Sequence, residues 1–240
     1  MNKKKFKNIL VVLGGPSGER AISLESGRAC IRALKKKGYN VSSFDSKYRN
    51  LNLINKKNID AIFNALHGKD GEDGIAQSYF EYLRIPYTHS GVISSFNAMN
   101  KLISKEIFLK NNIKTPKFFS IKKNFKMSMI YRNLKSKKIK YPVIIKPINE
   151  GSSLGVKLCN NMGSLKKSIK KLFKKYDELM VEKYVGGQEI QVAVINGKPL
   201  GAIELVPKRL FYDYKAKYTK AAKTQHIMPA RLNRSKYNEV

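Results

Sequence analysis

The sequence predicts an α/β fold, with an N-terminal domain built on a parallel sheet and a second part built on antiparallel strands. The first prediction rests on apolar runs that alternate with helical patterns through residues 9–83. The second rests on residues 189–206, where two strand-like segments flank an Asn-Gly turn. With 240 residues, the chain is long enough to form one or two domains with substantial cores.

The continuous apolar run Ile9–Leu13 is typical of a strand that a parallel sheet buries on both faces. A turn rich in glycine follows at 14–18. Ser23 is a candidate helix cap, because apolar residues then recur at helical spacing. Lysines and then Gly38 follow that pattern, and a glycine at such a place ends a helix.

Val41–Phe44 and Ala61–Leu66 predict the second and third strands, so this part reads as a doubly wound domain. His67 directly follows the third strand, in the glycine-rich segment HGKDGEDG (67–74). Ligands bind beyond the carboxyl ends of strands in open α/β sheets, which makes His67 a candidate substrate contact. The alternative is a loop histidine without a role, and the residues alone leave both interpretations open.

The chain between 75 and 140 predicts helices with short connections. One helix is expected at 75–83, followed by an extended segment at Ile85–Thr88 and a possible domain boundary at Ser90-Gly91. A further helix is expected from Met99 to Ile107. The polar and basic stretch 117–140 is expected to connect the two parts through one helix.

The stretch YPVIIKPINEGSSLG (141–155) places a lysine and a Gly/Ser loop at the end of a strand. Val143–Ile145 predicts a buried strand, and Lys146 follows it. The loop Gly151–Gly155 offers backbone N–H groups and hydroxyls that suit an anion, so one interpretation is a phosphate clamp. The other is a strand that ends in a surface turn. A Walker A loop is excluded, because no Gly-Lys-Ser/Thr follows the glycines.

The remaining chain predicts one helix and three strands. Ser164 is a candidate cap for a helix that ends near Phe173, and Leu179–Lys183 predicts a strand. Glu189–Ile195 and Gly201–Val206 are expected to form an antiparallel hairpin.

Beyond this hairpin, the aromatic and basic segment 211–218 is either a lid over a charged substrate or a loop that packs its rings on a core. No terminal element is expected after Pro229.

Composition points to an ordinary globular protein with an unusual charge. The formal net charge of +31 invites a nucleic-acid interpretation, but the lysines are spread along the chain and far outnumber the arginines that base reading favours. We therefore expect no specific nucleic-acid partner. No apolar run reaches a membrane span and no signal peptide is recognisable, so a cytoplasmic, membrane-free location is expected. Two cysteines are too few for a disulfide framework.

Six segments together resemble the D-alanine–D-alanine ligase family. They are LGGPSGERAISLESG (13–27), HGKDGEDG (67–74), the helix around Met99–Lys105, KPINEGSSLGV (146–156), VEKYVGGQE (181–189) and FYDYKAKY (211–218). The resemblance implies a Rossmann-like N-terminal domain at 1–93 and an ATP-grasp fold (α+β). Its central subdomain is expected at 94–178, and an incomplete C-terminal subdomain with the lid at 179–240.

The resemblance also implies an ATP site. Lys101, Lys146 and the lid residue Lys217 look like the lysines on the ATP phosphates. Three residues of one linker match the segment that contacts adenine: Glu182, Lys183 and Val185. Glu189 matches the carboxylate that holds the ribose.

A second set of matching residues implies the pocket of the first D-alanine. Glu19, Ser152 and Tyr218 match a hydrogen-bonded trio, assigned as catalytic, that shapes this pocket and latches the lid. His67 resembles the histidine near the carboxylate of the substrate, which turns an open interpretation into an expected substrate contact. The anion-binding interpretation of Gly151–Gly155 is strengthened in the same way.

The reaction implied is the ATP-dependent joining of two D-alanines for peptidoglycan synthesis, through an acylphosphate and then a tetrahedral intermediate. Such chemistry needs cations around the phosphoryl group and exclusion of water. The family uses Mg²⁺ or Mn²⁺ and commonly dimerises. Its metal ligands and oxyanion arginine have no match before Val240. The chain as given is therefore expected to be truncated and nearly inactive, and an assay of phosphate release with D-alanine tests this.

Two other functions stay open on the sequence. One is a related ATP-grasp ligase that joins D-alanine to D-lactate or D-serine. The other is a basic nucleic-acid-binding module. Substrate profiling distinguishes the first, and salt-sensitive binding that survives Lys146→Ala distinguishes the second.

Overall fold

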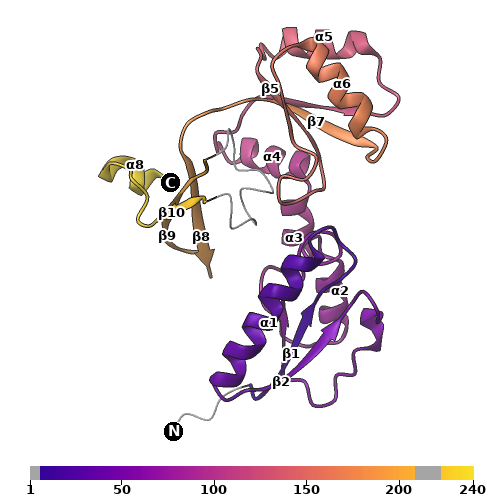
Figure 1. Ribbon diagram of the computed structural model, residues 1–240, viewed down its shortest axis with the longest axis vertical. Coiled ribbons are helices and arrows are strands. Elements are labelled where there is room, and N and C mark those ends of the chain that lie inside the picture. The colour runs from indigo at the N-terminus through magenta and orange to yellow at the C-terminus, as the bar shows by residue number, and fades with distance from the viewer. Residues whose placement is uncertain (1–5, 209–222) are drawn as a thin grey trace. The chain divides into compact units, whose positions relative to one another are not determined.

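The computed structural model describes residues 6–208 and 223–240, which form two compact units (Figure 1). The first unit comprises the described residues up to Thr115 together with Ile148–Gly151. The second comprises Pro116–Pro147 and the described residues from Ser152 to Val240. The domain bounds that the family resemblance implies, 1–93, 94–178 and 179–240, stay a prediction.

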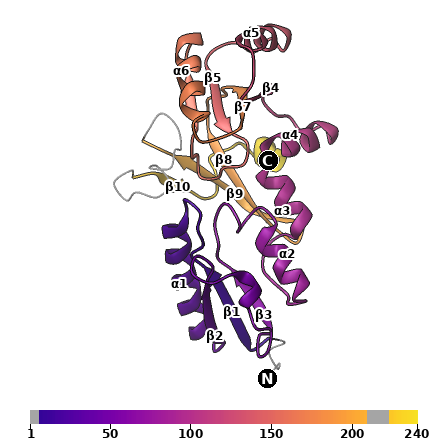
Figure 2. The same ribbon diagram turned by 90° about the vertical axis from the view of Figure 1, so that its right-hand side faces the viewer.

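The first unit is built on a parallel sheet of order β2-β1-β3, with β1 at Asn8–Leu13, β2 at Asn40–Asp45 and β3 at Ala61–Asn64. Alternate residues of β1 face different helices, because side chains alternate along a strand. Ile9, Val11 and Leu13 pack with Leu24, Ile31 and Leu34 of α1 (Arg20–Lys36). Leu10 and Val12 share a cluster with Ala76 and Phe80 of α2 (Ile75–Tyr82). Figure 2 shows these two helices on opposite sides of the sheet.

Two details of this unit differ from the sequence prediction. Helix α1 begins at Arg20, so Ser23 lies inside it and does not cap it. The Ser23 hydroxyl instead donates to Ala65 O at 2.6 Å and accepts from Gly14 N at 2.8 Å, which links the helix to loops at both strand ends. Strand β3 ends at Asn64 rather than Leu66. The predicted end of α1 is confirmed, since Gly38 has φ 77° and donates to Lys35 O.

The single helix expected from Met99 to Ile107 is interrupted at its start, because Met99 ends one helix and a second helix begins two residues later. Helix α3 covers Val92–Met99, and α4 covers Lys101–Lys110. Asn100 lies between them with extended backbone (ψ 107°), and its side chain accepts from Leu102 N and Ile103 N. The apolar periodicity continues across Asn100, so only the local capping chemistry of that residue separates the helices. The short elements of this unit are a 3-10 turn, η1, at Leu51–Leu53 and a bridge between Ile62 and Tyr87.

The second unit contains a sheet of order β4-β7-β5-β6 in which all neighbours are antiparallel. Its strands are β4 (Phe118–Lys122), β5 (Val143–Pro147), β6 (Lys157–Cys159) and β7 (Glu178–Lys183). One face packs against α5 (Met127–Ser136) and α6 (Met162–Leu172), through a cluster that includes Ile130, Val143, Ile145, Leu165 and Val181. Residues between these on the strands therefore point to the opposite face.

Two short strands of that sheet were not predicted. Strand β4 lies in the stretch expected to hold one helix, and it has only five residues, of which Phe119 and Ile121 are buried. Strand β6 has three residues. In addition, Asn161 rather than Ser164 caps α6, and Ser164 closes a reciprocal capping box with it.

A separate antiparallel sheet of order β10-β9-β8 completes the unit. The predicted hairpin is confirmed: β8 covers Glu189–Ile195, β9 covers Lys198–Val206, and both Asn196 and Gly197 have positive φ. The expectation that nothing follows Pro229 is wrong, because β10 (Gln225–Ile227) is followed by α8 (Arg234–Glu239). No helix among the described residues is long and apolar enough to cross a membrane.

Candidate functional site

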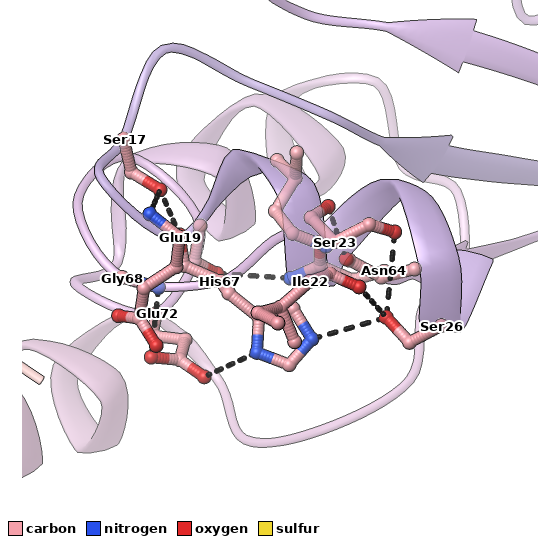
Figure 3. Close-up of polar contacts among 12 residues, drawn as sticks. Ser17, Glu19, Ile22, Ser23, Ser26, Asn64, His67, Gly68 and Glu72 are labelled. Carbon is pink, nitrogen blue, oxygen red and sulfur yellow. Dashed lines mark hydrogen bonds and ion pairs between the residues drawn. The ribbon is translucent and has the colours of Figure 1, made fainter. Parts of the chain in front are cut away.

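In the first unit, the carboxyl ends of β1 and β3 bring together two glycine-bearing loops. The loop after β1 runs to Glu19, which directly precedes α1 and is 4% exposed. The loop after β3 begins at Ala65 and carries His67 and Gly68. Ser17 joins the two loops, since its hydroxyl donates to His67 O at 2.7 Å (Figure 3). Glu19 and His67, two of the four residues assigned to the substrate pocket, therefore lie at one edge of the sheet.

Glycine is required where these loops approach the Glu19 carboxylate. A Cβ added at Gly68 would lie 2.7 Å from Glu19 Oε2, and one added at Gly151 would lie 2.9 Å from the same oxygen. Gly68 also has φ 68°. The carboxylate is thus covered by backbone from two loops, and a larger residue at either glycine would displace it.

His67 is held between a serine and a carboxylate, as Figure 3 shows. Its Nε2 lies 3.2 Å from Ser26 Oγ, and its Nδ1 lies 3.8 Å from Glu72 Oε1. The Ser26 hydroxyl proton is already donated to Ile22 O at 2.9 Å, so Oγ accepts a hydrogen bond from Nε2–H. Glu72 is itself fixed, because Gly68 N donates to its Oε2 at 2.9 Å. This arrangement orients the ring and places an acceptor beside Nδ1.

A pocket of about 560 Å³ opens beside this histidine, within the first unit. Its lining comes from α1, β3, the loop after β3, α2, the segment before α3 and α3 itself, and includes His67, Glu72, Gln77 and His89. His89 has φ 78° and its Nε2 lies 2.8 Å from Asn64 O, so the ring donates to that carbonyl. A non-glycine residue in this backbone region costs energy and is commonly found at ligand sites.

Lys101 begins α4 and reaches the segment Ile148–Gly151, which belongs to the same unit. Its Nζ donates to Ile148 O at 3.4 Å and also to Glu150 O. The backbone N–H of Lys101 donates to Ile148 O at 3.0 Å. The predicted phosphate lysine therefore ties this short segment to α4.

In the second unit, Lys146 of β5 pairs with Glu182 of β7. The register sets Ile144 opposite Glu182, so Lys146 is its diagonal neighbour on the same face. This face is the one opposite α5 and α6. Both side chains are largely covered, with exposures of 20% and 10%, which makes the pair a charged site on a protected surface.

The other residues assigned to the adenine linker lie just beyond this pair. Lys183 ends β7 opposite Val143 and is exposed. Val185 is 64% exposed in the loop that follows.

Ser152 and Ser153 both adopt left-handed backbone, with φ 47° and 58°, and Gly155 follows at φ 74°. A run of such residues gives the tight loop that the sequence predicts. A Cβ on Gly155 would lie 2.8 Å from Pro147 Cγ, so this glycine lets the loop fold back on the end of β5.

Glu189 starts β8 opposite Leu205, and the loop before it is anchored by a buried carboxylate. Gln188 Nε2 lies 3.2 Å from Glu204 Oε1, and Arg231 binds both oxygens of Glu204 at 2.8 and 3.0 Å. Hydrogen bonds from Arg231 lower the pKa of the Glu204 carboxyl to about 2. Lys217 and Tyr218, assigned to the lid, lie outside the described residues.

Several partners of the site were not predicted from the sequence. Ser17, Ser26 and Glu72 hold the loop and the ring of His67, and Gln188 holds the start of β8. Glu72 follows His67 by five residues in one glycine-rich loop, which is a signal that could have identified it. The described residues include no group of three or more His, Cys, Asp and Glu side chains that could hold a metal ion.

Comparison with known proteins shows which family this fold belongs to. Family profiles described as the C-terminus and the N-terminus of D-Ala–D-Ala ligase match residues 107–240 and 42–90. A curated D-alanine–D-alanine ligase of Pelagibacter ubique (strain HTCC1062) is 50% identical over 232 residues, which cover 95% of this chain and 74% of that protein.

Solved structures of the same family resemble this chain in fold as well. The D-alanine–D-alanine ligase of Bacillus anthracis has a TM-score of 0.78 at 35% identity, covering 92% of this chain and 71% of its own. A structure of that enzyme complexed with ATP has a TM-score of 0.76 at 31% identity and covers 92% of this chain and 70% of its own.

The α/β unit and the two antiparallel sheets of the second unit therefore form the fold of an ATP-grasp ligase, as predicted. Within that class, the chain belongs to the D-alanine–D-alanine ligase family. The resemblance read from the six sequence segments is confirmed.

Proposed function

We propose that this chain serves the ATP-dependent ligation of two D-alanines to D-alanyl-D-alanine, the dipeptide of peptidoglycan precursors. The observation that carries the proposal is the 50% identity to a D-alanine–D-alanine ligase over 95% of the chain. We further propose a cytoplasmic location and a homodimer for the complete enzyme. ATP and D-alanine are its substrates, with Mg²⁺ or Mn²⁺ as the metal.

The first D-alanine binds where Glu19 and His67 meet. The buried Glu19 carboxylate suits the ammonium group of an amino acid, and a histidine with Nε2–H donated to Ser26 has its ring fixed near the substrate carboxylate. Ser152, on its left-handed loop, and Tyr218 complete the assigned catalytic trio. Their task is to orient the substrate carboxylate for phosphorylation and to keep water from the acylphosphate.

ATP binds through the assigned lysines and the adenine linker. Lys101, Lys146 and Lys217 neutralise the phosphates, because phosphoryl transfer depends mainly on positioning and on charge stabilisation. Glu182, Lys183 and Val185 contact the base, and Glu189 holds the ribose. A metal ion would neutralise phosphate charge further, and no described residue is assigned to it.

Titration calorimetry with ATP tests the nucleotide site. Replacing Lys146 by Met should weaken ATP binding by about tenfold to a hundredfold, because a hydrogen bond between charged groups contributes about 1.5–3 kcal/mol. Lys157→Met is the matched control, since Lys157 is an exposed lysine on the neighbouring strand β6. It changes the net charge equally and should leave ATP affinity within about twofold of the unchanged chain.

The Lys146 variant also leaves Glu182 without this cation in a largely covered place, so folding must be checked separately. Lys146→Arg keeps a cation next to Glu182 and should bind ATP with intermediate affinity, because a planar fork replaces a point charge. Equal ATP affinity of the unchanged chain and a folded Lys146→Met variant would contradict the assignment.

A further inference from the structure

The outer side of helices α5 and α6 gathers cations that are spread along the sequence. From Pro116 to Tyr176 the only acidic residue is Glu150, and it belongs to the first unit. Helix α6 and the turn after it carry six exposed lysines: Lys166, Lys167, Lys170, Lys171, Lys174 and Lys175. Helix α5 and the residues after it add exposed Arg132, Lys135, Lys137, Lys138 and Lys140. The positive charges of this layer therefore add to one another instead of alternating with carboxylates.

The lysines of α6 lie in rows on the exposed side of the helix. Lys166, Lys170 and Lys174 follow one another at intervals of four residues, so their side chains leave the chain about 6 Å apart along the axis. The opposite side of the helix is fixed, because Leu165 and Ile169 are buried against the sheet. The rows must therefore face solvent or a partner.

Two exposed side chains with apolar surface lie in the same charged layer. Met129 and Tyr131, both on α5, are 43% and 52% exposed. Lys166 Nζ lies 6.0 Å from the centroid of the Tyr131 ring, so the outer surfaces of the two helices meet there. Tyrosine is enriched where proteins meet the headgroups of a bilayer, and lysine keeps its ammonium group at that level while its stem covers apolar surface.

Two observations favour a bilayer over a nucleic acid as the partner. Both helices pack on one face of a sheet and form a layer, whereas a single strand is held in a groove and a duplex takes one helix into its major groove. In addition, ten of the eleven cations named above are lysines. A lipid surface attracts charge of any kind, whereas the planar fork of arginine is what nucleic-acid recognition favours.

We propose that the outer face of α5 and α6 is a docking surface for a bilayer that contains anionic lipids. The ammonium groups lie over the lipid phosphates, and Met129 and Tyr131 enter the headgroup layer. The sequence expectation of a membrane-free location rested on the lack of an apolar run long enough to span a bilayer, and peripheral docking needs no such run. The proposal does not depend on the ligase function, because its test reads binding to lipid alone.

Co-sedimentation with lipid vesicles tests the charges. The chain should bind vesicles of phosphatidylcholine with about 30% phosphatidylglycerol far more strongly than pure phosphatidylcholine, and added NaCl should weaken this binding. Replacing Lys166, Lys170 and Lys174 together by glutamine should lower the partition into anionic vesicles by about tenfold to a hundredfold. The matched control replaces three exposed lysines at the end of α1, Lys35, Lys36 and Lys37, and should stay within about twofold of the unchanged chain.

Fluorescence tests the location of the contact. The chain has no tryptophan, so Tyr131→Trp places a single reporter on the proposed face. Its emission should shift to shorter wavelength when anionic vesicles are added, because the ring leaves water. Tyr82→Trp is the control, since Tyr82 lies on α2 of the first unit and is 84% exposed. Its emission should not change.

Three results would overturn the proposal. One is an equal loss of vesicle binding in both lysine triplets, which would assign the attraction to net charge. Another is an unchanged emission of Tyr131→Trp on a vesicle-bound chain, and this readout decides even if the glutamine variant does not fold. The third is binding of poly(U) RNA that depends on the same three lysines while vesicles stay unbound, which would make the face a nucleic-acid surface. None of these results bears on ATP binding, so failure here is distinguishable from failure of the proposed function.

Discussion

At the scale of single residues, the Glu204 carboxylate shows how a buried charge is made stable by its partners. Arg231 binds both carboxylate oxygens, Gln188 donates to one of them, and the Arg231 backbone N–H donates at 3.3 Å. Such bonds favour the charged form, which is why the pKa falls from 4.5 to about 2. The same side chain joins β9, the loop before β8 and the segment after β10.

This lowered pKa predicts a pH-dependent stability. The carboxylate stabilises the fold fully above its unfolded pKa near 4.5, and this contribution is lost as the pH falls from there to about 2. Glu204→Gln should therefore be less stable than the unchanged chain at pH 7, and the difference should shrink steadily between pH 4.5 and 2. Urea unfolding followed by circular dichroism across this range measures it.

Glu239→Gln is the control, because Glu239 is exposed at the end of α8 and its loss changes the net charge by the same amount. A Glu204→Gln deficit that stays constant with pH, or that the control reproduces, would assign the effect to net charge instead of to the Arg231 contact.

At the scale of elements, helix α6 depends on its first turn. Asn161 accepts from Ser164 N at 2.9 Å, and Asn161 N donates to Ser164 Oγ at 3.2 Å. The helix buries Leu165, Ile169 and Leu172 against the sheet that carries Lys146. A cap at this end therefore helps to hold one wall of the unit.

Asn161→Ala should lower the free energy of unfolding by about 1 kcal/mol, and Asn161→Gly by only a few tenths, because glycine tolerates the cap backbone. Amide hydrogen exchange should speed up first in the opening turn of α6. The adjacent exposed Asn160 offers the matched control, since Asn160→Ala should change neither quantity. Equal effects at both positions would show that the capping box does not stabilise the helix.

The elements also show what can be read from a sequence. The hairpin of β8 and β9 was predictable, because Asn196 and Gly197 supply the positive φ values that a two-residue turn needs. Strand β5 was equally clear from three β-branched residues. Strand β6, with three residues, and the break at Asn100 were not, because each depends on a local contact and leaves no periodicity.

The residues of the site were also predictable only where a local sequence feature marks them. Glu19, His67 and Lys146 were found because glycines and strand ends mark their positions, and the resemblance supplied their roles. Ser26 was missed, since it lies 41 residues from His67 in the sequence and only the fold brings the two side chains together.

At the scale of the whole molecule, the charge of +31 is the dominant physical property. Forty-eight basic residues face 17 acidic ones, and helices α5 and α6 carry no acidic residue in their first turns. Such an excess destabilises a folded chain through self-repulsion and attracts polyanions without sequence preference. The stability of the whole folded chain should therefore increase when added salt screens its charges.

We expect the melting temperature to rise by roughly 2–4 °C when NaCl increases from about 0.02 to about 0.2 M, which corresponds to about 1 kcal/mol for a chain of this size. Screening acts on every pair of like charges, so sodium sulfate at equal ionic strength should give nearly the same shift. A much larger shift with sulfate would mean that a few sites, such as the cations assigned to ATP phosphates, bind the anion specifically. Differential scanning calorimetry with both salts separates the two, and a melting temperature that falls with added NaCl would show that attractive ion pairs outweigh the repulsion.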